Sequence, residues 1–351
     1  MIQKVFFKLL LFLLRFLGFF NFKKNNVAVF CCPLFIGDMV FLFPLIRAMK
    51  LNNPERKIIF LCREEFKYLL TFNADIDQVR AVNKSAINTL KNYWAIVNAT
   101  YFYLPMADYW KRLARAIHAK NIISFDSPKN FNALKLLGIQ NPHHLSEYLL
   151  ELLPPDEFAK IDSKPYLKTH FNYPNLLVIQ CDGRNSNTKV FTDNQLEMMI
   201  EAISAFPIQI KLMGLYRPLK KINFSNVIDL RGRSSFEDWL KYILGADFVV
   251  GLDSAAAQLR KAAGKSAYIL MGPADNLFFG NTTLFSNINL TANDNLSCRD
   301  RKVFQGHFFK TLNNCQKNVC DNPNGRVCID GKIFNLFLDK IRNNLELLFK
   351  V

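Results

Sequence analysis

Acidic residues are scarce in this chain of 351 residues: 29 Asp and Glu stand against 45 Lys and Arg, so the net charge is +16. Such an excess suits an anionic partner, namely a membrane surface, a nucleic acid or a phosphorylated substrate. Only 21% of the residues are charged and half are hydrophobic, which excludes long disordered regions and predicts packed cores. There is also no repeat of solenoid period and no low-complexity tract.

Paired cysteine motifs are lacking too, although the chain has eight cysteines. Four of them, Cys298, Cys315, Cys320 and Cys328, lie near the C-terminus at uneven spacings, and none forms a Cys-x-x-Cys pair. The pattern favours structural or incidental thiols over a zinc site, and we expect no metal. With no clean secretion signal, free thiols in a reducing compartment fit better than a disulfide framework.

Residues 1–24 contain five basic residues and no acid. On a helix, Lys4, Lys8 and Arg15 share one narrow arc, and Phe and Leu cover most of the remainder. This pattern predicts a basic amphipathic helix that lies in the membrane interface, with its cations toward anionic headgroups. A signal anchor and a helix packed on the protein are the alternatives.

After residue 24, short apolar runs alternate with amphipathic segments in two series. The first has strands at 27–32, 57–62, 79–82, 94–99 and 122–125, with helices at 39–51, 64–72 and 145–153. The second has strands at 176–180, 208–213, 227–230, 248–252 and 267–271, with helices at 193–205 and 235–244, a small-residue helix ending at Gly264, and a last helix at 333–349. The proline pair at 154–155 marks the boundary. We therefore predict two doubly wound α/β domains, 25–155 and 170–325, with a cleft between them and a terminal helix at 330–351.

One strand–helix–strand unit, at 246–273, carries a possible ligand site. Its first strand stops at Asp253-Ser254, either of which can cap the helix that follows. Free N–H groups and the helix dipole attract anions there, and the small residues at 255–257 let a ligand approach the backbone. The turn predicts a phosphate site; an ordinary capped crossover helix is the alternative.

The loop after the first strand contains Gly37 and Asp38. Because ligands bind outside the carboxyl ends of the strands in such sheets, Asp38 is expected at the cleft, where it could act as general base. The alternative is structural, with Asp38 as helix cap and Gly37 permitting the turn.

Together these segments resemble the family-nine glycosyltransferases, the lipopolysaccharide heptosyltransferase type. The resemblance covers nearly all of residues 26–345. The motifs that carry it are Ile-Gly-Asp at 36–38 with FPLIRA at 43–48, LRG at 230–232 with SSF at 234–236, GLDS at 251–254, LMGP at 270–273, and the cysteines of the C-terminal segment.

The resemblance implies a GT-B architecture, with an N-terminal acceptor domain and a C-terminal nucleotide-sugar domain. It also implies inverting, metal-independent transfer, often of an ADP-activated heptose to a lipid-linked sugar, on the cytoplasmic face of the bacterial inner membrane. Asp38 matches the catalytic base, with Gly37 on the acceptor side. The residues that match the donor side are Lys189, Arg184, Gly214, Asp253, Ser254, Ala255 and Gln258.

The donor turn departs from the family pattern at two positions, because Ala255 replaces a glycine and Gln258 a histidine. Gln258 can donate a hydrogen bond, but unlike histidine it cannot bind a proton and become positively charged. A non-catalytic relative that binds nucleotide sugar or glycan is therefore the main alternative. A sugar-nucleotide epimerase remains open, and nucleic-acid binding is suggested by the net charge alone, since no base-reading module is recognisable.

Overall fold

The chain divides into two units, Met1–Lys168 with Gly306–Phe308 and Thr169–Gln305 with Phe309–Val351, and each is described by itself. The computed structural model describes residues 25–32, 35–81, 99–104, 114–115, 118–124, 135, 137–140, 142–154, 157–162, 164–182, 189–215, 222, 224–272, 276–292, 326 and 328–350, with the backbone alone at 301–305 and 308–313. The predicted membrane-interface helix at 1–24 lies outside the described residues.

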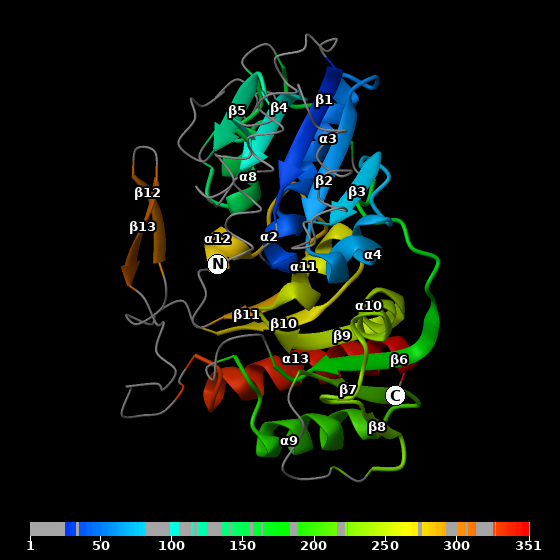
Figure 1. The fold of residues 1–351 in the computed structure, drawn as a ribbon. Helices are drawn as coiled ribbons and strands as arrows, with labels where there is room; N and C mark the ends of the chain where they lie inside the picture. The colour runs from blue at the N-terminus through cyan, green and yellow to red at the C-terminus, as the bar shows by residue number, and fades with distance from the viewer. Residues whose placement is uncertain are drawn as a thin grey trace, which may run out of the picture. The chain divides into compact units, whose positions relative to one another are not determined.

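The first unit is built on a parallel sheet of five strands in the order β3-β2-β1-β4-β5 (Figure 1). The strands are β1 (Asn25–Cys31), β2 (Lys57–Cys62), β3 (Gln78–Ala81), β4 (Ala99–Leu104) and β5 (Asn121–Ser124). The chain starts in the centre and winds outward in both directions, as in a doubly wound fold. Of the strand predicted at 94–99, only Ala99 is among the described residues, and there it begins β4.

The helices that the structure describes over their full length in this unit are α2 (Ile36–Val40), α3 (Phe43–Asn52), α4 (Lys67–Leu70) and α8 (Leu145–Leu150), with a 3-10 turn at Glu64–Phe66. The single helix predicted at 39–51 is wrong, because the chain forms α2 and α3 with a turn at Phe41 and Leu42. Pro44 explains the break: it has no N–H to continue a helix, and it fits the first turn of a new one.

Buried arginines attach the segment after the proline pair to this unit. Arg47 of α3 donates to Asp75, to Asp162 at 2.7 Å and to the carbonyl of Pro165 at 3.1 Å. Arg56 forms a buried ion pair with Glu157. The chain thus stays with the first unit until Lys168.

The second unit is built on a parallel sheet of six strands in the order β11-β10-β9-β6-β7-β8 (Figure 1). The strands are β6 (Tyr173–Gln180), β7 (Gln209–Met213), β8 (Val227–Asp229), β9 (Ala246–Leu252), β10 (Tyr268–Met271) and β11 (Asn289–Ala292). In chain order this is the 3-2-1-4-5-6 arrangement of dinucleotide-binding folds. A further pair, β12 (Arg301–Gln305) and β13 (Phe308–Asn313), forms a separate sheet.

The helices of the second unit are α9 (Asp193–Ser204), α10 (Phe236–Gly245), α11 (Ala255–Ala262), α12 (Asn276–Phe279) and α13 (Lys332–Phe349). Figure 1 shows α9 and α13 on one side of the sheet and α10 on the other. Alternate strand residues such as Leu177 and Ile179 pack with α9 and α13 in one buried cluster, because successive strand side chains face opposite ways. The predicted doubly wound α/β fold class is confirmed.

Two neighbours on α13 test this core. Phe337 is 1% exposed and lies in the cluster, whereas Leu336 is 49% exposed. We expect Phe337→Ala to lower the free energy of unfolding by about 3–5 kcal/mol, because it leaves a cavity. Leu336→Ala should change it by about 0.5 kcal/mol or less. Chemical denaturation followed by circular dichroism measures both, and equal losses would contradict the packing described.

Candidate functional site

The carboxyl ends of β6 and β9 define the candidate site of the second unit. These strands are neighbours in the sheet, but the chain leaves β6 toward β7 and leaves β9 toward β10. In an open parallel sheet, ligands bind at such a topological switch point. The residues directly after the two strands are therefore the first candidates.

The turn after β9 presents the start of α11. Ser254 is the N-cap residue in extended conformation, and its side chain makes no cap hydrogen bond. Its Oγ is buried and has no hydrogen-bond partner in the part of the chain that the structure describes. The first turn holds no acid. Backbone N–H groups and the positive end of the helix dipole at such a helix start attract anions, and Asp253, Ser254 and Ala255, which the sequence analysis assigned to a donor turn, lie there.

An ion pair joins the loop that follows β6 to the residue that follows β9. The Nζ atom of Lys189 donates to Oδ2 of Asp253 at 2.7 Å, although 64 positions separate them. The Asp253 side chain is 11% exposed and that of Lys189 is 26% exposed. The structure thus brings together two of the predicted donor-side residues. Arg184 lies outside the described residues.

The backbone around Lys189 is anchored to the end of β6. Asp182 and Val190 form an antiparallel bridge, and the N–H of Phe191 donates to the carbonyl of Cys181 at 2.9 Å. Arg326 donates to the carbonyl of Val190 at 2.7 Å. The position of the lysine is therefore held by backbone contacts as well as by Asp253.

Gly214 marks the end of β7, and its role is steric. A Cβ atom on this residue would lie 2.5 Å from Oδ2 of Asp182, so any other residue would require that carboxylate to move. Both oxygens of Asp182 accept the N–H of Leu215 at 3.0 Å. The sequence interpretation missed Asp182; its only signal is an acid placed two residues after a buried strand.

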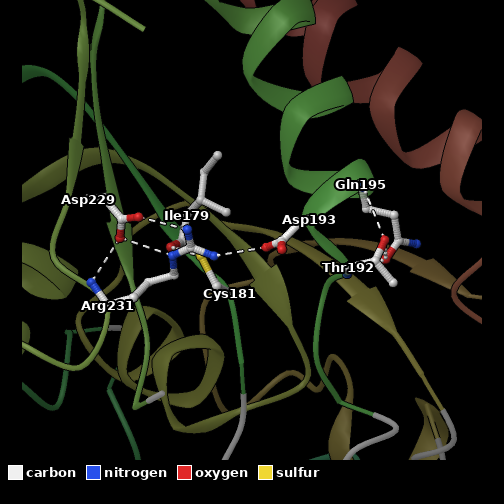
Figure 2. A network of polar contacts seen from close by, with 7 residues as sticks. All are labelled: Ile179, Cys181, Thr192, Asp193, Gln195, Asp229 and Arg231. Carbon is white, nitrogen blue, oxygen red and sulfur yellow. Dashed lines mark hydrogen bonds and ion pairs between the residues drawn. The ribbon is translucent and has the colours of Figure 1, made fainter. Parts of the chain in front are cut away.

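The network in Figure 2 fixes the loop after β8. Arg231 is 5% exposed and binds both carboxylate oxygens of Asp229, at 3.0 and 2.7 Å, and Asp193 at 3.4 Å. The N–H of Gly232 donates to the carbonyl of Gly214 at 2.9 Å. The LRG motif therefore supports the site by fixing the loop beside β7.

Gln258 does not point freely into the site. It is buried, and its Nε2 donates to the carbonyl of Phe279 at 3.2 Å. Lys261, one turn later, donates to the same carbonyl at 2.8 Å and to that of Gly280. Burial lowers the pKa of Lys261 to about 8, while the charge of Asp253 opposes the change. Gln258 and Lys261 thus tie α11 to the end of α12.

In the first unit, Asp38 follows the central strand β1 and lies in the first turn of α2, with Phe35 as the N-cap residue. Burial raises the pKa of the Asp38 carboxyl, and a hydrogen bond with the backbone of Phe35 opposes the rise. A carboxylate with a raised pKa is a better proton acceptor near neutral pH. Gly37 lies beside it in α2.

Four aromatic residues, Tyr101, Tyr103, Tyr109 and Trp110, are candidates for lining an acceptor groove or for the core, and the structure describes the first two. Tyr103 is 1% exposed and stacks on Phe30 with ring centroids 4.6 Å apart, so it belongs to the core. Tyr101 carries Arg56 over its ring at 4.9 Å. Tyr109 and Trp110 lie outside the described residues.

Within the described ranges, no group of three or more His, Cys, Asp or Glu could hold a metal ion. Cys31, Cys62 and Cys181 are free and buried, Cys32 is buried, and Cys328 is partly exposed. The other three cysteines of the C-terminal segment are not among the described residues. None of the described helices has the length and hydropathy of a membrane span.

Comparison with known proteins gives likenesses of fold. No protein-family model matches the chain, and no curated protein sequence matches it. A family 9 glycosyltransferase from Veillonella parvula superposes with a TM-score of 0.59 at 12% identity, over 79% of this chain and 90% of that one. E. coli heptosyltransferase WaaC, with ADP-2-deoxy-2-fluoro heptose, gives 0.57 at 16% identity, over 90% and 99%.

E. coli ADP-heptose LPS heptosyltransferase II gives a TM-score of 0.54 at 12% identity, again over 90% of this chain and 99% of that one. At these identities the likeness establishes the fold, and the predicted resemblance to the family-nine glycosyltransferases is confirmed at that level. The chain has the GT-B fold of these enzymes.

Proposed function

We propose that this protein is a glycosyltransferase that takes a sugar from a nucleoside diphosphate donor. The observation that carries the proposal is the turn between β9 and α11, where an acid-free helix N-terminus lies beside the Lys189–Asp253 ion pair at the switch point of a dinucleotide-type sheet. Backbone N–H groups, the helix dipole and a lysine together suit a diphosphate. The GT-B fold supports the same reading.

The proposed reaction is an inverting displacement. The oxygen of an acceptor hydroxyl forms a bond to the anomeric carbon, while the bond from that carbon to the diphosphate oxygen breaks and its electron pair leaves with the nucleoside diphosphate. Asp38 takes the hydroxyl proton as general base. Lys189 and the N–H groups of α11 stabilise the charge that develops on the leaving diphosphate. These groups allow a mechanism that requires no metal.

The donor and acceptor are proposed from chemistry and resemblance. ADP-heptose is the first donor to consider, since WaaC was determined with ADP and the E. coli heptosyltransferase TibC with ADP-D-beta-D-heptose. An anionic envelope glycolipid, such as a lipopolysaccharide core, would suit the net charge of +16. The basic segment at 1–24 would hold the enzyme at the cytoplasmic surface of the inner membrane as a peripheral protein.

The alternative is a non-catalytic relative that binds nucleotide sugar or glycan. It is favoured by Gln258, whose amide is engaged by the carbonyl of Phe279 and lies where the family has a histidine. The two proposals differ in whether bound donor is turned over.

The donor site is tested by thermal unfolding with ADP, UDP, GDP and CMP and their common sugars. A ligand at one hundred times its dissociation constant adds about 2.7 kcal/mol, which raises Tm by a few degrees. We expect one nucleotide to act selectively and the shift to disappear in Lys189→Ala, because the phosphates lose a cation. Lys332→Ala, an exposed lysine at the start of α13, should keep it. No shift with any of these ligands would refute the donor site.

The catalytic role is tested by Asp38→Asn, which we expect to lower kcat by about 100- to 10,000-fold with donor binding preserved. The acid limb of the wild-type pH profile should lie above the usual range of Asp, because burial raises the pKa of Asp38. Asp339→Asn, which changes an exposed carboxylate of α13, should leave turnover unchanged. Nucleotide binding without turnover in the wild-type protein would favour the non-catalytic relative.

Asp38→Asn should also change stability with a defined sign. A carboxyl whose pKa is raised in the folded state gives stability that is present below about pH 4 and is lost as pH rises through the folded pKa. The neutral amide avoids this loss. We expect the Tm of the variant to exceed that of the wild type at pH 7.5 and the difference to vanish near pH 3.5. A variant that is less stable at pH 7.5 would contradict the burial of the charge.

A further inference from the structure

Asp253 has the wrong charge for the place it occupies. It directly precedes the N-cap residue of α11, where the proposed function puts a diphosphate, and its side chain is 11% exposed. Like charges repel strongly when little water lies around them. A carboxylate left alone there would weaken the binding of any phosphate, so its presence needs an explanation.

Lys189 forms an ion pair with Asp253 and so neutralises its charge. Its Nζ lies 2.7 Å from Oδ2 of Asp253, close enough for a charge-assisted hydrogen bond. An ammonium group has three N–H donors, and one of those of Lys189 is used in this bond. The 26% exposure of the lysine leaves room for a ligand to approach the ammonium while it stays attached to Asp253.

Lys261 is a second lysine whose charge interacts with Asp253. It is 1% exposed, and its ammonium donates to the carbonyls of Phe279 and Gly280, so it is anchored inside the unit. Its charge nevertheless acts on Asp253, as the effect of that carboxylate on the pKa of Lys261 indicates. Asp253 thus interacts with two lysines, through a direct ion pair with Lys189 and through a Coulombic attraction to Lys261.

A free lysine side chain samples many rotamers, and fixing it on a ligand costs binding free energy. The ion pair with Asp253 orders the Lys189 side chain before a ligand binds, so the ligand does not have to supply the free energy of ordering it. The backbone bridge between Asp182 and Val190 fixes the root of the same side chain. Lys189 is therefore held at both of its ends.

We infer that Asp253 is a positioning residue: it holds the ammonium of Lys189 at the N-terminus of α11 and so increases affinity for a nucleoside diphosphate, although its own charge repels that ligand. The inference rests on the proposed function of this site. It makes a prediction of unusual sign, because removal of a negative charge from a phosphate site should weaken phosphate binding.

The test compares ADP and adenosine binding to wild type, Asp253→Asn, Lys189→Met and the double variant by isothermal titration calorimetry. We expect Asp253→Asn to weaken ADP about 3- to 10-fold, since Lys189 must be ordered by the ligand. Lys189→Met should weaken it more, and the double variant should bind ADP at least as tightly as Lys189→Met, because Asp253 helps only through the lysine and repels the phosphates when it is left alone. Adenosine, which has no phosphate, should bind all four proteins alike.

The matched control is Asp247→Asn, which removes the same charge from the exposed amino end of the same strand β9. It should leave ADP affinity unchanged. Asp253→Glu, which keeps the carboxylate, should retain most of the affinity and covers the case in which the asparagine variant does not fold.

Three outcomes overturn the inference while the proposed function stands: tighter or unchanged ADP binding in Asp253→Asn, additive losses in the double variant, or an equal loss for adenosine, which would indicate a structural role. If the folded wild-type protein binds neither ADP, UDP, GDP nor inorganic pyrophosphate, the proposed function fails and the inference fails with it.

Discussion

The parallel direction of all strands in the six-stranded sheet of the second unit determines where its chemistry can lie. All six strands end at one edge of the sheet, so every loop that follows a strand begins there. Because β6 and β9 are neighbours whose chains leave in opposite directions, the loops after them part and leave the start of α11 open. Asp182, Lys189 and Asp253 meet at this edge for that reason. Arg231, with Asp229 and Asp193, then fixes the loop after β8 beside them.

Several buried cations of the second unit are satisfied by backbone carbonyls rather than by carboxylates. Arg260 donates to the carbonyls of Ser266, Ile243, Ala246 and Asp247, and burial lowers its pKa to about 10. Lys261 and Lys265 also donate to carbonyls. Charged groups that leave water need such partners. Of the buried carboxylates, Asp253 pairs with a lysine, Glu157 with an arginine, and Asp182 with a backbone N–H.

Most of the architecture could be predicted from the sequence, because continuous apolar runs such as 176–180 and 248–252 mark buried parallel strands. The prediction failed where the signal is short or mixed: β11 has a half-exposed, polar sequence, and one proline divides the helix predicted at 39–51. The site was predicted in part. Ser254 and Asp253 follow a strand directly, but no spacing reveals that Lys189 reaches Asp253 or that Asp182 lies against Gly214.

The departures of the donor turn from the family pattern affect side chains more than the anion site itself. Ala255 keeps the backbone N–H that a glycine would offer, and a methyl group is the whole difference. The side chain of Gln258 donates a hydrogen bond to the carbonyl of Phe279, at the end of α12. Lys261 donates to the same carbonyl, so both side chains connect α11 to α12. What remains for a diphosphate is the helix N-terminus and an ammonium fixed by Asp253, and neither depends on the replaced residues. The proposed binding of a diphosphate is therefore compatible with a glutamine at position 258.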